Sequence, residues 1–183
     1  MSVILSILKW VGIAIAVLIG LGFVLPDRQT VERSVTINAD PETVFSLIGD
    51  FNNWDSWSPW ADKDPNMQVT VQGSGLGQSM SWVSEDPNVG VGSQEIIEFS
   101  PNSNLVMALD FGDMGKAEAS FILAPGTNGG TEVMWTLDTN MREGVPFLMK
   151  PMATYMGFMM DKMVGQDYEK GLSQLKAAAE SAS

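Results

Sequence analysis

The stretch Thr30 to Trp60, TVERSVTINADPETVFSLIGDFNNWDSWSPW, decides the fold because it contains three structural signals in succession. The first is the alternation from Val31 to Ile37, which has the period of a strand with one buried face, made of Val31, Arg33, Val35 and Ile37. Asp40 then offers a helix N-cap, and Pro41 suits the first helical turn. The helix that follows is predicted to have an apolar face made of Val44, Phe45, Leu47 and Ile48. A corner rich in tryptophan closes the unit.

A nearly continuous apolar segment precedes this unit, from Val3 to Leu25, and Pro26 ends it. As a helix its 23 residues span about 35 Å, which is enough to cross a hydrocarbon core of about 30 Å. Lys9 lies near one end and can extend its ammonium group toward the headgroups, so it does not prevent insertion. We therefore expect residues 1–26 to form a transmembrane signal-anchor.

A cleaved signal peptide is the alternative for this segment. The residues before Pro26 are Gly-Phe-Val-Leu, which lack the small-x-small pattern that signal peptidase prefers, so a retained anchor is favoured. The charge rule for orientation is almost balanced, because Lys9 and the N-terminal amine on one side face Arg28 and Arg33 on the other. The short amino-terminal tail with its lysine favours a single-pass membrane protein whose globular part is exported to a periplasmic or extracytoplasmic location. A globular part on the cytoplasmic side is the alternative.

Residues 27–183 have the size of one domain with its own core. They contain all 22 acidic residues and nine of the ten basic ones, so the formal charge of this part is −13. No nucleic-acid partner is expected, because phosphate binding requires clustered Lys and Arg. The negative charge also repels anionic headgroups, which makes residues 3–25 the expected membrane contact. The chain has no cysteine, which excludes disulfides, thiolate nucleophiles and zinc–thiolate sites.

Beyond Trp60 the chain reads as six short strands separated by turn residues. The predicted strands are Met67 to Val71, Met80 to Trp82, Val91 to Phe99, Leu105 to Phe111, Lys116 to Ala124 and Val133 to Leu137. Asn128-Gly-Gly130 is a strong hairpin signal. No connection is long enough for a parallel crossover, so the sheet is predicted to be antiparallel.

The last predicted element is a long helix within Pro146 to Glu180, which starts or kinks at Pro151. Apolar residues recur at helical spacing and predict one buried face, made of Met152, Met156, Met159, Met163, Leu172 and Leu175. Gly165 and Gly171 are interpreted as sites of close packing against the sheet. The tail from Ala177 to Ser183 is expected to fray.

Three motifs in this order resemble the START-like (SRPBCC) superfamily, and within it the polyketide cyclase/dehydrase-like proteins. They are NADPETVF (38–45), WDSWSPW (54–60) and DKMVGQDYEKGLSQLK (161–176). The resemblance covers nearly all of residues 27–183 and implies an α+β helix-grip fold, in which a curved antiparallel seven-stranded sheet wraps a long C-terminal helix, here preceded by one transmembrane helix. It says little about function, because such proteins include lipid carriers, hormone receptors, cyclases and oxygenase subunits.

In this fold a cavity is expected between the concave sheet and the helix. The candidate ligand-binding residues are Trp57, Trp60, Trp82, Trp135, Met156, Met159 and Met163. The alternative is that these side chains fill a solid core, which is the commoner role of both residue types. For Trp54, Trp57 and Trp60 the membrane interface is a further alternative.

Catalysis has few candidate residues, because histidine and cysteine are absent. Glu95 or Glu98 points inward depending on the phase of the strand, and a carboxylate in an apolar cavity can act as an acid or base. For both, a solvated strand position is the favoured interpretation. The acidic stretch Asp62 to Gly73 lacks the glycine and glutamate of a calcium loop, and the glycines from Gly73 to Gly77 precede a strand, where a phosphate loop needs a helix. No metal or cofactor is expected.

The sequence therefore predicts a membrane-anchored START-like domain that binds a hydrophobic small molecule or lipid. A cyclase or dehydratase enzyme is one alternative. A protein-interaction module with a collapsed cavity is the other.

Overall fold

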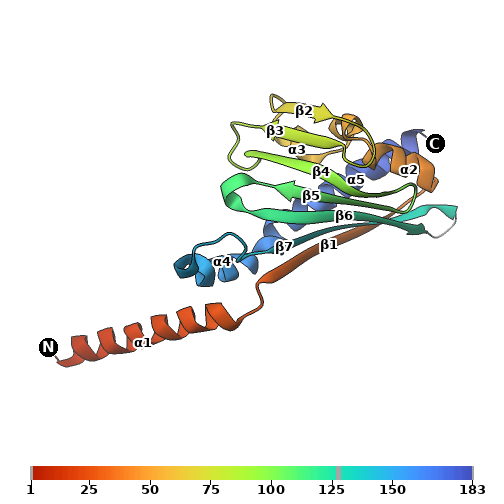
Figure 1. Ribbon diagram of the computed structural model, residues 1–183. Coiled ribbons are helices and arrows are strands. Elements are labelled where there is room, and N and C mark those ends of the chain that lie inside the picture. The colour runs from red at the N-terminus through yellow and green to blue at the C-terminus, as the bar shows by residue number, and fades with distance from the viewer. Residues whose placement is uncertain (1, 127–128, 183) are drawn as a thin grey trace.

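The computed structural model describes residues 2–126 and 129–182 and consists of a curved sheet, a long helix that crosses it, and an apolar helix at the N-terminus (Figure 1). The helices are α1 (Ser2–Val24), α2 (Pro41–Ile48), η1 (Phe51–Ser56), α3 (Pro59–Lys63), η2 (Gly112–Met114), η4 (Phe147–Met149), α4 (Lys150–Gly157) and α5 (Met160–Ala182). The strands are β1 (Arg28–Ile37), β2 (Gln68–Gln72), β3 (Ser79–Val83), β4 (Val91–Ser100), β5 (Asn104–Asp110), β6 (Lys116–Pro125) and β7 (Thr131–Asn140).

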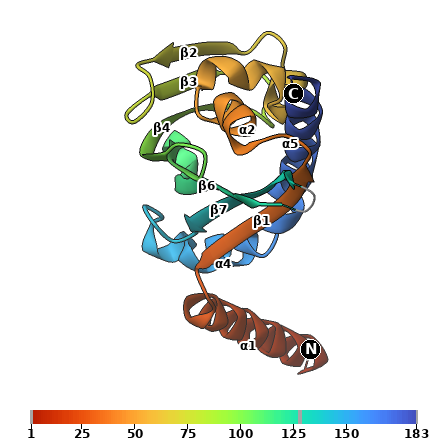
Figure 2. The same ribbon diagram turned by 90° about the vertical axis from the view of Figure 1, so that its right-hand side faces the viewer.

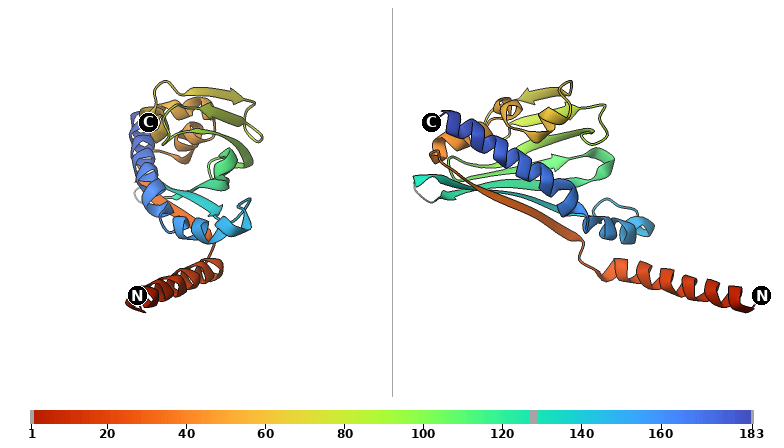
Figure 3. Two further views of the ribbon diagram at one scale, coloured as in Figure 1. Left: turned by 90° about the vertical axis from the view of Figure 1, so that its left-hand side faces the viewer. Right: turned by 180° about the vertical axis from the view of Figure 1, so that it is seen from behind.

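The sheet is a seven-stranded antiparallel meander in the order β1-β7-β6-β5-β4-β3-β2. Its curvature places α5 on the concave side, as Figure 2 and the right-hand view of Figure 3 show. This confirms the predicted helix-grip fold. The β6–β7 turn was expected at Asn128-Gly-Gly130, but Asn128 lies outside the described residues. Gly126 N donates a hydrogen bond to Gly130 O at 2.8 Å across this turn.

The unit that follows β1 forms as its sequence predicts. Asp40 is the N-cap of α2 and accepts a hydrogen bond from Thr43 N at 2.8 Å. Asp50 caps η1 in the same way and accepts from Asn52 N at 3.0 Å. Pro59 begins α3 and separates it from η1, so the tryptophan corner is not one continuous helix.

Asp50 also supports a buried amide. It accepts from Gln78 Nε2 at 2.8 Å, while the Oε1 atom of the same fully buried side chain accepts from Phe51 N at 3.0 Å. The hydrogen bond from Gln78, followed by those from Asn52, holds the pKa of the Asp50 carboxyl below its usual value.

We expect Asp50→Asn to lower the free energy of unfolding at pH 7 by about 1 kcal/mol, because asparagine keeps the cap but removes the charge. A carboxyl pKa lowered by folding stabilises the protein above its unfolded value of about 3.9, and this stabilisation is lost as the pH falls through the folded value. Urea unfolding at pH 7 and pH 3 should therefore show a smaller difference between the two proteins at pH 3 than at pH 7. Asp55→Asn, at an exposed neighbour, is the control. An equal difference at both pH values would contradict this account.

Aromatic rings fill the space between the middle of the sheet and α5. Trp135 of β7 stacks on Tyr168 of α5 at a centroid distance of 3.8 Å and on Phe121 of β6 at 4.7 Å. Trp57 meets Trp135 edge-on at 5.7 Å. A Cβ atom at Gly171 would lie 2.8 Å from the Trp135 ring, so the glycine allows α5 to approach the sheet this closely.

Arg33 of β1 also connects α5 to the sheet, through two ion pairs. Its guanidinium binds Asp161 at 2.8 Å and Glu169 at 2.7 Å. A Cβ atom at Gly165 would lie 2.1 Å from the guanidinium, so this glycine leaves the space in which Arg33 crosses the helix. The packing role expected of both glycines is confirmed.

The C-terminal helix differs from the expectation in two ways. It is interrupted at Phe158 and Met159, which divides it into α4 and α5. Leu172 and Leu175 are buried as predicted, but the predicted burial of four methionines in the protein core is wrong, because Met152, Met156, Met159 and Met163 are each more than half exposed. For Met152 and Met156 the break explains this, since α4 packs mainly on α1.

The C-terminal tail is ordered as a helix, which corrects the expected fraying of residues 177–182. Ala179 is fully buried, and Glu180 Oε1 accepts a hydrogen bond from Asn38 N at 2.9 Å. Ser183 lies outside the described residues.

Candidate functional site

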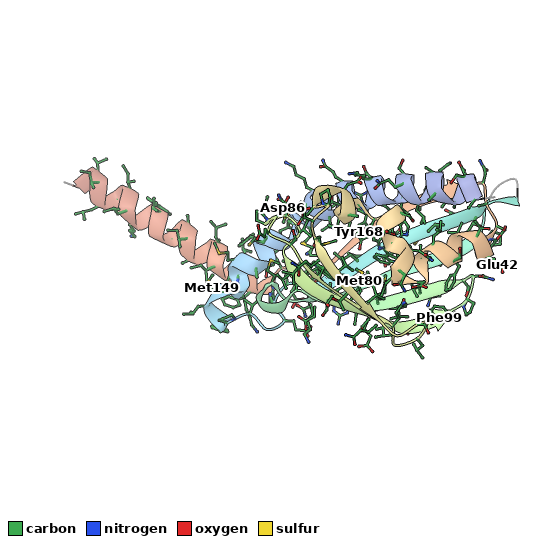
Figure 4. All side chains as sticks on the ribbon, turned by 90° about the horizontal axis from the view of Figure 1, so that it is seen from above. Glu42, Met80, Asp86, Phe99, Met149 and Tyr168 are labelled. Atoms are coloured by element: carbon green, nitrogen blue, oxygen red, sulfur yellow. The ribbon has the colours of Figure 1, made fainter. Side chains whose placement is uncertain are left out.

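The concave face of the sheet changes character along the strands. One line of register partners is buried, and it consists of Val31, Leu137, Ala119, Met107 and Ile96. The line of inward-facing partners two residues nearer to the α4 end of the sheet continues from β2 to β1 as Val71, Met80, Gln94, Leu109, Ala117, Thr139 and Gln29, and we call its first five members, on β2 to β6, the inner row. Its four apolar members are only partly buried. Met80 is labelled in Figure 4. The concave face therefore keeps accessible apolar surface toward this end.

Gln94 is the one polar member of the inner row. Its side chain is 5% exposed, and its Nε2 atom has no hydrogen-bond partner among the described residues. Its register partners are Met80 and Leu109, whose side chains offer at most the weak thioether acceptor of Met80. A buried N–H group without a partner is costly, so this amide is suited to an acceptor supplied by a ligand.

Trp82 lies two residues beyond Met80 on β3, nearer to the same end of the sheet. A Cβ atom at its partner Gly92 would lie 2.4 Å from the Trp82 ring, so the indole covers this glycine. Phe111 meets Trp82 edge-on at 6.0 Å. At this rim lies an open hollow of about 510 Å³, lined by Val91, Gly92, Ser93, Asp110, Phe111, Gly112 and Met114.

The structure separates the candidate tryptophans into two groups. Trp57 and Trp135 are fully buried in the aromatic core, and Trp60 meets Trp135 edge-on at 5.7 Å. These three rings form a packed wall. Trp82 stands apart at the rim of the sheet, where it is accessible. The positions of Trp57 and Trp135 therefore agree with the interpretation that these two tryptophans are core residues.

The candidate methionines lie at a different hollow. Met156 and Met159 line a groove of about 490 Å³ between α1 and α4, and Met163 is exposed on the first turns of α5. The lining of the groove consists of Ile15, Leu18, Ile19, Pro151, Met152, Tyr155, Met156 and Met159. Every one of these residues is apolar apart from the Tyr155 hydroxyl.

Three side chains, those of Tyr155, Phe147 and Arg142, hold η4 and α4 against α1. Tyr155 Oη donates a hydrogen bond to Leu18 O at 2.7 Å, and the ring of Phe147 stacks on Phe23 at 4.9 Å. Arg142, between β7 and η4, donates to Gly22 O and to Leu25 O at the end of α1. Its Nε atom donates to Thr154 of α4 at 2.8 Å. Sequence reasoning missed Arg142 and Tyr155, since neither stands in a recognisable motif.

Glu95 and Glu98 both lie on the solvent side, which agrees with the favoured interpretation. A β-bulge between Ile96 and Glu98 shifts the register, so Gln94, Ile96 and Phe99 face inward and neither expected phase is correct. Asn104 Nδ2 donates to Glu98 at 3.3 Å. Neither carboxylate supplies an acid or base to the inner face. Over residues 2–126 and 129–182 there is no cluster of His, Cys, Asp and Glu that fits a metal ion.

Residues 28–180 match the family model described as polyketide cyclase / dehydrase and lipid transport. The chain belongs to this family. The match begins at the first residue of β1, so α1 lies outside it, and it ends within the last turn of α5. The part of the chain that folds as a helix-grip domain is thus the part that the family defines. A search of the curated proteins found no match.

Solved structures of the family's fold are similar at low identity. A START superfamily protein from Mycobacterium smegmatis is 20% identical with a TM-score of 0.59, over 84% of this chain and 99% of that one. The di-domain ARO/CYC StfQ from the steffimycin biosynthetic pathway is 11% identical with a TM-score of 0.62, over 85% of this chain and 51% of that one. Ara h 8.0201 is 14% identical with a TM-score of 0.57, over 84% and 99%. At such identities the likeness concerns the fold alone.

α1 has the length and composition of a membrane span. Within the described residues it is the one helix that passes this test, over Val3–Val24 with a mean hydropathy of 2.4. Most of its side chains are exposed in the structure, and the contacts with α4 and η4 described above involve its C-terminal half.

Proposed function

We propose that the protein is a membrane-anchored member of this family that binds a hydrophobic molecule, such as a lipid, on the concave face of its sheet. The observation that carries the proposal is the inner row, where two partly exposed apolar side chains lie on each side of the buried Gln94 amide, whose Nε2 atom has no partner among the described residues. A matching ligand has an apolar body and at least one hydrogen-bond acceptor, such as a carbonyl oxygen. The family description, which includes lipid transport, supports this ligand class.

The position of the inner row favours a ligand that comes from the membrane. The accessible end of the concave face is the end at which β1 joins α1, and α4 packs there, because a Cβ atom at Gly157 would lie 2.8 Å from Met141 and 2.9 Å from Gln29. In this proposal α1 is a retained signal-anchor, residues 27–183 form the ligand-binding domain, and the domain is exported. The anchor raises the local concentration of the domain near lipid-soluble molecules.

A pair of matched variants tests the ligand site. Ala117 faces inward in the inner row, whereas Ala108 lies on the adjacent strand and faces outward, where it is exposed. We expect Ala117→Trp to reduce the amount of co-purified ligand about tenfold or more, because the indole occupies the space above Leu109. Ala108→Trp should leave it unchanged. Native mass spectrometry of the full chain, released from detergent in the gas phase, measures the bound mass.

The same mass spectra would also show the outcomes that contradict the proposal. A wild-type chain without added mass, or equal loading of the two variants, would overturn binding on the concave face. The protein mass tests the anchor separately: the full chain has a mass of 19.8 kDa, and a species that starts after Pro26 would show that α1 is removed.

A further inference from the structure

The largest group of exposed apolar side chains outside α1 lies on η4, α4 and the start of α5. Eight residues form it, each at least half exposed, and we call them the apolar patch: Phe147, Leu148, Met149, Met152, Met156, Phe158, Met159 and Met163. Leu148 is 87% exposed. Met149, labelled in Figure 4, lies at the end of the domain beside α1. An apolar patch of this size on a soluble surface marks an interaction site.

The charge of this segment differs from that of the rest of the domain. Lys150 is the single charged residue from Gly144 to Met160, although the domain contains 22 acidic residues. The repulsion that the acidic domain exerts on anionic headgroups is therefore weakest here. Lys150 itself has a side chain long enough to place its ammonium group among headgroup phosphates.

The polar side chains of α4 other than Lys150 are satisfied within the protein. Thr154 is fully buried, accepts from Arg142 Nε at 2.8 Å and donates to Lys150 O at 3.0 Å. Tyr155 donates to Leu18 O at 2.7 Å. A helix on a water-exposed surface has no need of this arrangement, whereas a helix in hydrocarbon requires it, because no water is present to pair with its polar groups.

The position of α4 along α1 determines how deep α4 would lie in a membrane that α1 spans. The contacts of α4 and η4 reach from Phe23 to Ile15 of α1. The stretch from Ile15 to Val24 is about 14 Å long, which is close to the thickness of one hydrocarbon leaflet, about 15 Å. If α1 spans the bilayer, α4 lies in the leaflet on the side of the domain.

We infer that η4 and α4 are inserted in one leaflet of the membrane, so that lipid covers the apolar patch and acyl chains fill the groove between α1 and α4. This inference rests on the proposed role of α1 as a membrane span. The continuity of the apolar patch with the exposed face of α1 identifies the lipid as the occupant. The four methionines at helical spacing are then buried as their pattern predicts, with lipid in the place of the sheet.

The absence of native cysteine allows a direct test of depth. Single cysteines are placed in the full chain at Met152 and Phe158 in the apolar patch, at Val11 in the middle of α1, and at Leu76. Leu76 is 66% exposed, in the β2–β3 turn at the opposite end of the sheet (Figure 1). Each variant carries a nitroxide label and is reconstituted in phosphatidylcholine nanodiscs. The collision rates of the label with oxygen and with a water-soluble nickel chelate then report its surroundings.

We expect the oxygen-to-nickel ratio at Met152 and Phe158 to exceed that at Leu76 at least tenfold and to approach that at Val11. A lipid-like ratio at Val11 together with ratios at Met152 and Phe158 equal to that at Leu76 would overturn the insertion and leave the anchor intact. A water-like ratio at Val11 would overturn the anchor itself. Labels at Met152 and Phe158 that neither reagent reaches would show that a second copy of the chain covers the apolar patch, which also overturns the inference.

Discussion

Replacing Trp135 with alanine is expected to lower the free energy of unfolding by about 3–5 kcal/mol. The indole is 1% exposed and lies between Tyr168 and Phe121, so its removal leaves a cavity that these rigid rings cannot close. Its Nε1 atom has no hydrogen-bond partner in the described part of the chain, so the loss is one of packing. Urea unfolding of the full chain, followed by far-ultraviolet circular dichroism in one detergent, measures the change.

Trp82→Ala is the matched control, because Trp82 is partly exposed at the rim of the sheet. We expect it to cost about 1 kcal/mol. The comparison also separates the two interpretations of the tryptophans. If Trp135 lined an open chamber, its removal would cost about as much as that of Trp82, and the description of a filled aromatic core would be wrong.

The second large effect is expected at Gly171 of α5. A Cβ atom there would lie 2.8 Å from Trp135 Cζ3 and 3.0 Å from Pro59 Cδ. Both neighbours are parts of rings and cannot rotate away, so α5 must withdraw from the sheet. We expect Gly171→Val to lower the free energy of unfolding by about 2–3 kcal/mol in the same urea assay.

Ser173→Val controls for the effect of a β-branched residue in the helix, since Ser173 is exposed two positions along α5. Its cost should stay within about 0.5 kcal/mol. Equal costs at the two positions would mean that the close approach of α5 to Trp135 does not contribute to stability.

The elements with a local signal were predictable from the sequence. The alternation in β1, the cap at Asp40 and the glycine-containing turn at 73–77 each depend on a few adjacent residues, and each appears where it was expected. The bulge at Ile97 was not predictable. One extra residue reverses which side chains of a strand face inward, and no particular residue type marks its position. For this reason neither expected phase of β4 identified Gln94 as the inward polar residue.

The candidate site was predictable only in part, because the methionine pattern does not show what the apolar face of the helix packs against. Helical spacing from Met152 to Met163 correctly indicated one apolar face. It could not show that a break at Phe158 turns part of this face away from the sheet and toward α1. The contacts of Arg142 with Gly22 and Leu25 join residues that are far apart in the chain, so they also leave no local trace.

The junction between α1 and β1 has a mechanical consequence. Only Leu25, Pro26 and Asp27 separate the two elements, and β1 pairs with β7 along its whole length, from Arg28 opposite Asn140 to Ile37 opposite Thr131. A pull on the N-terminal helix is therefore transmitted along β1 and strains all of these backbone hydrogen bonds together, in shear, where a perpendicular pull would open them one by one. If α1 spans a membrane as proposed, a force on that span therefore moves the domain as one unit and does not open it at its first strand.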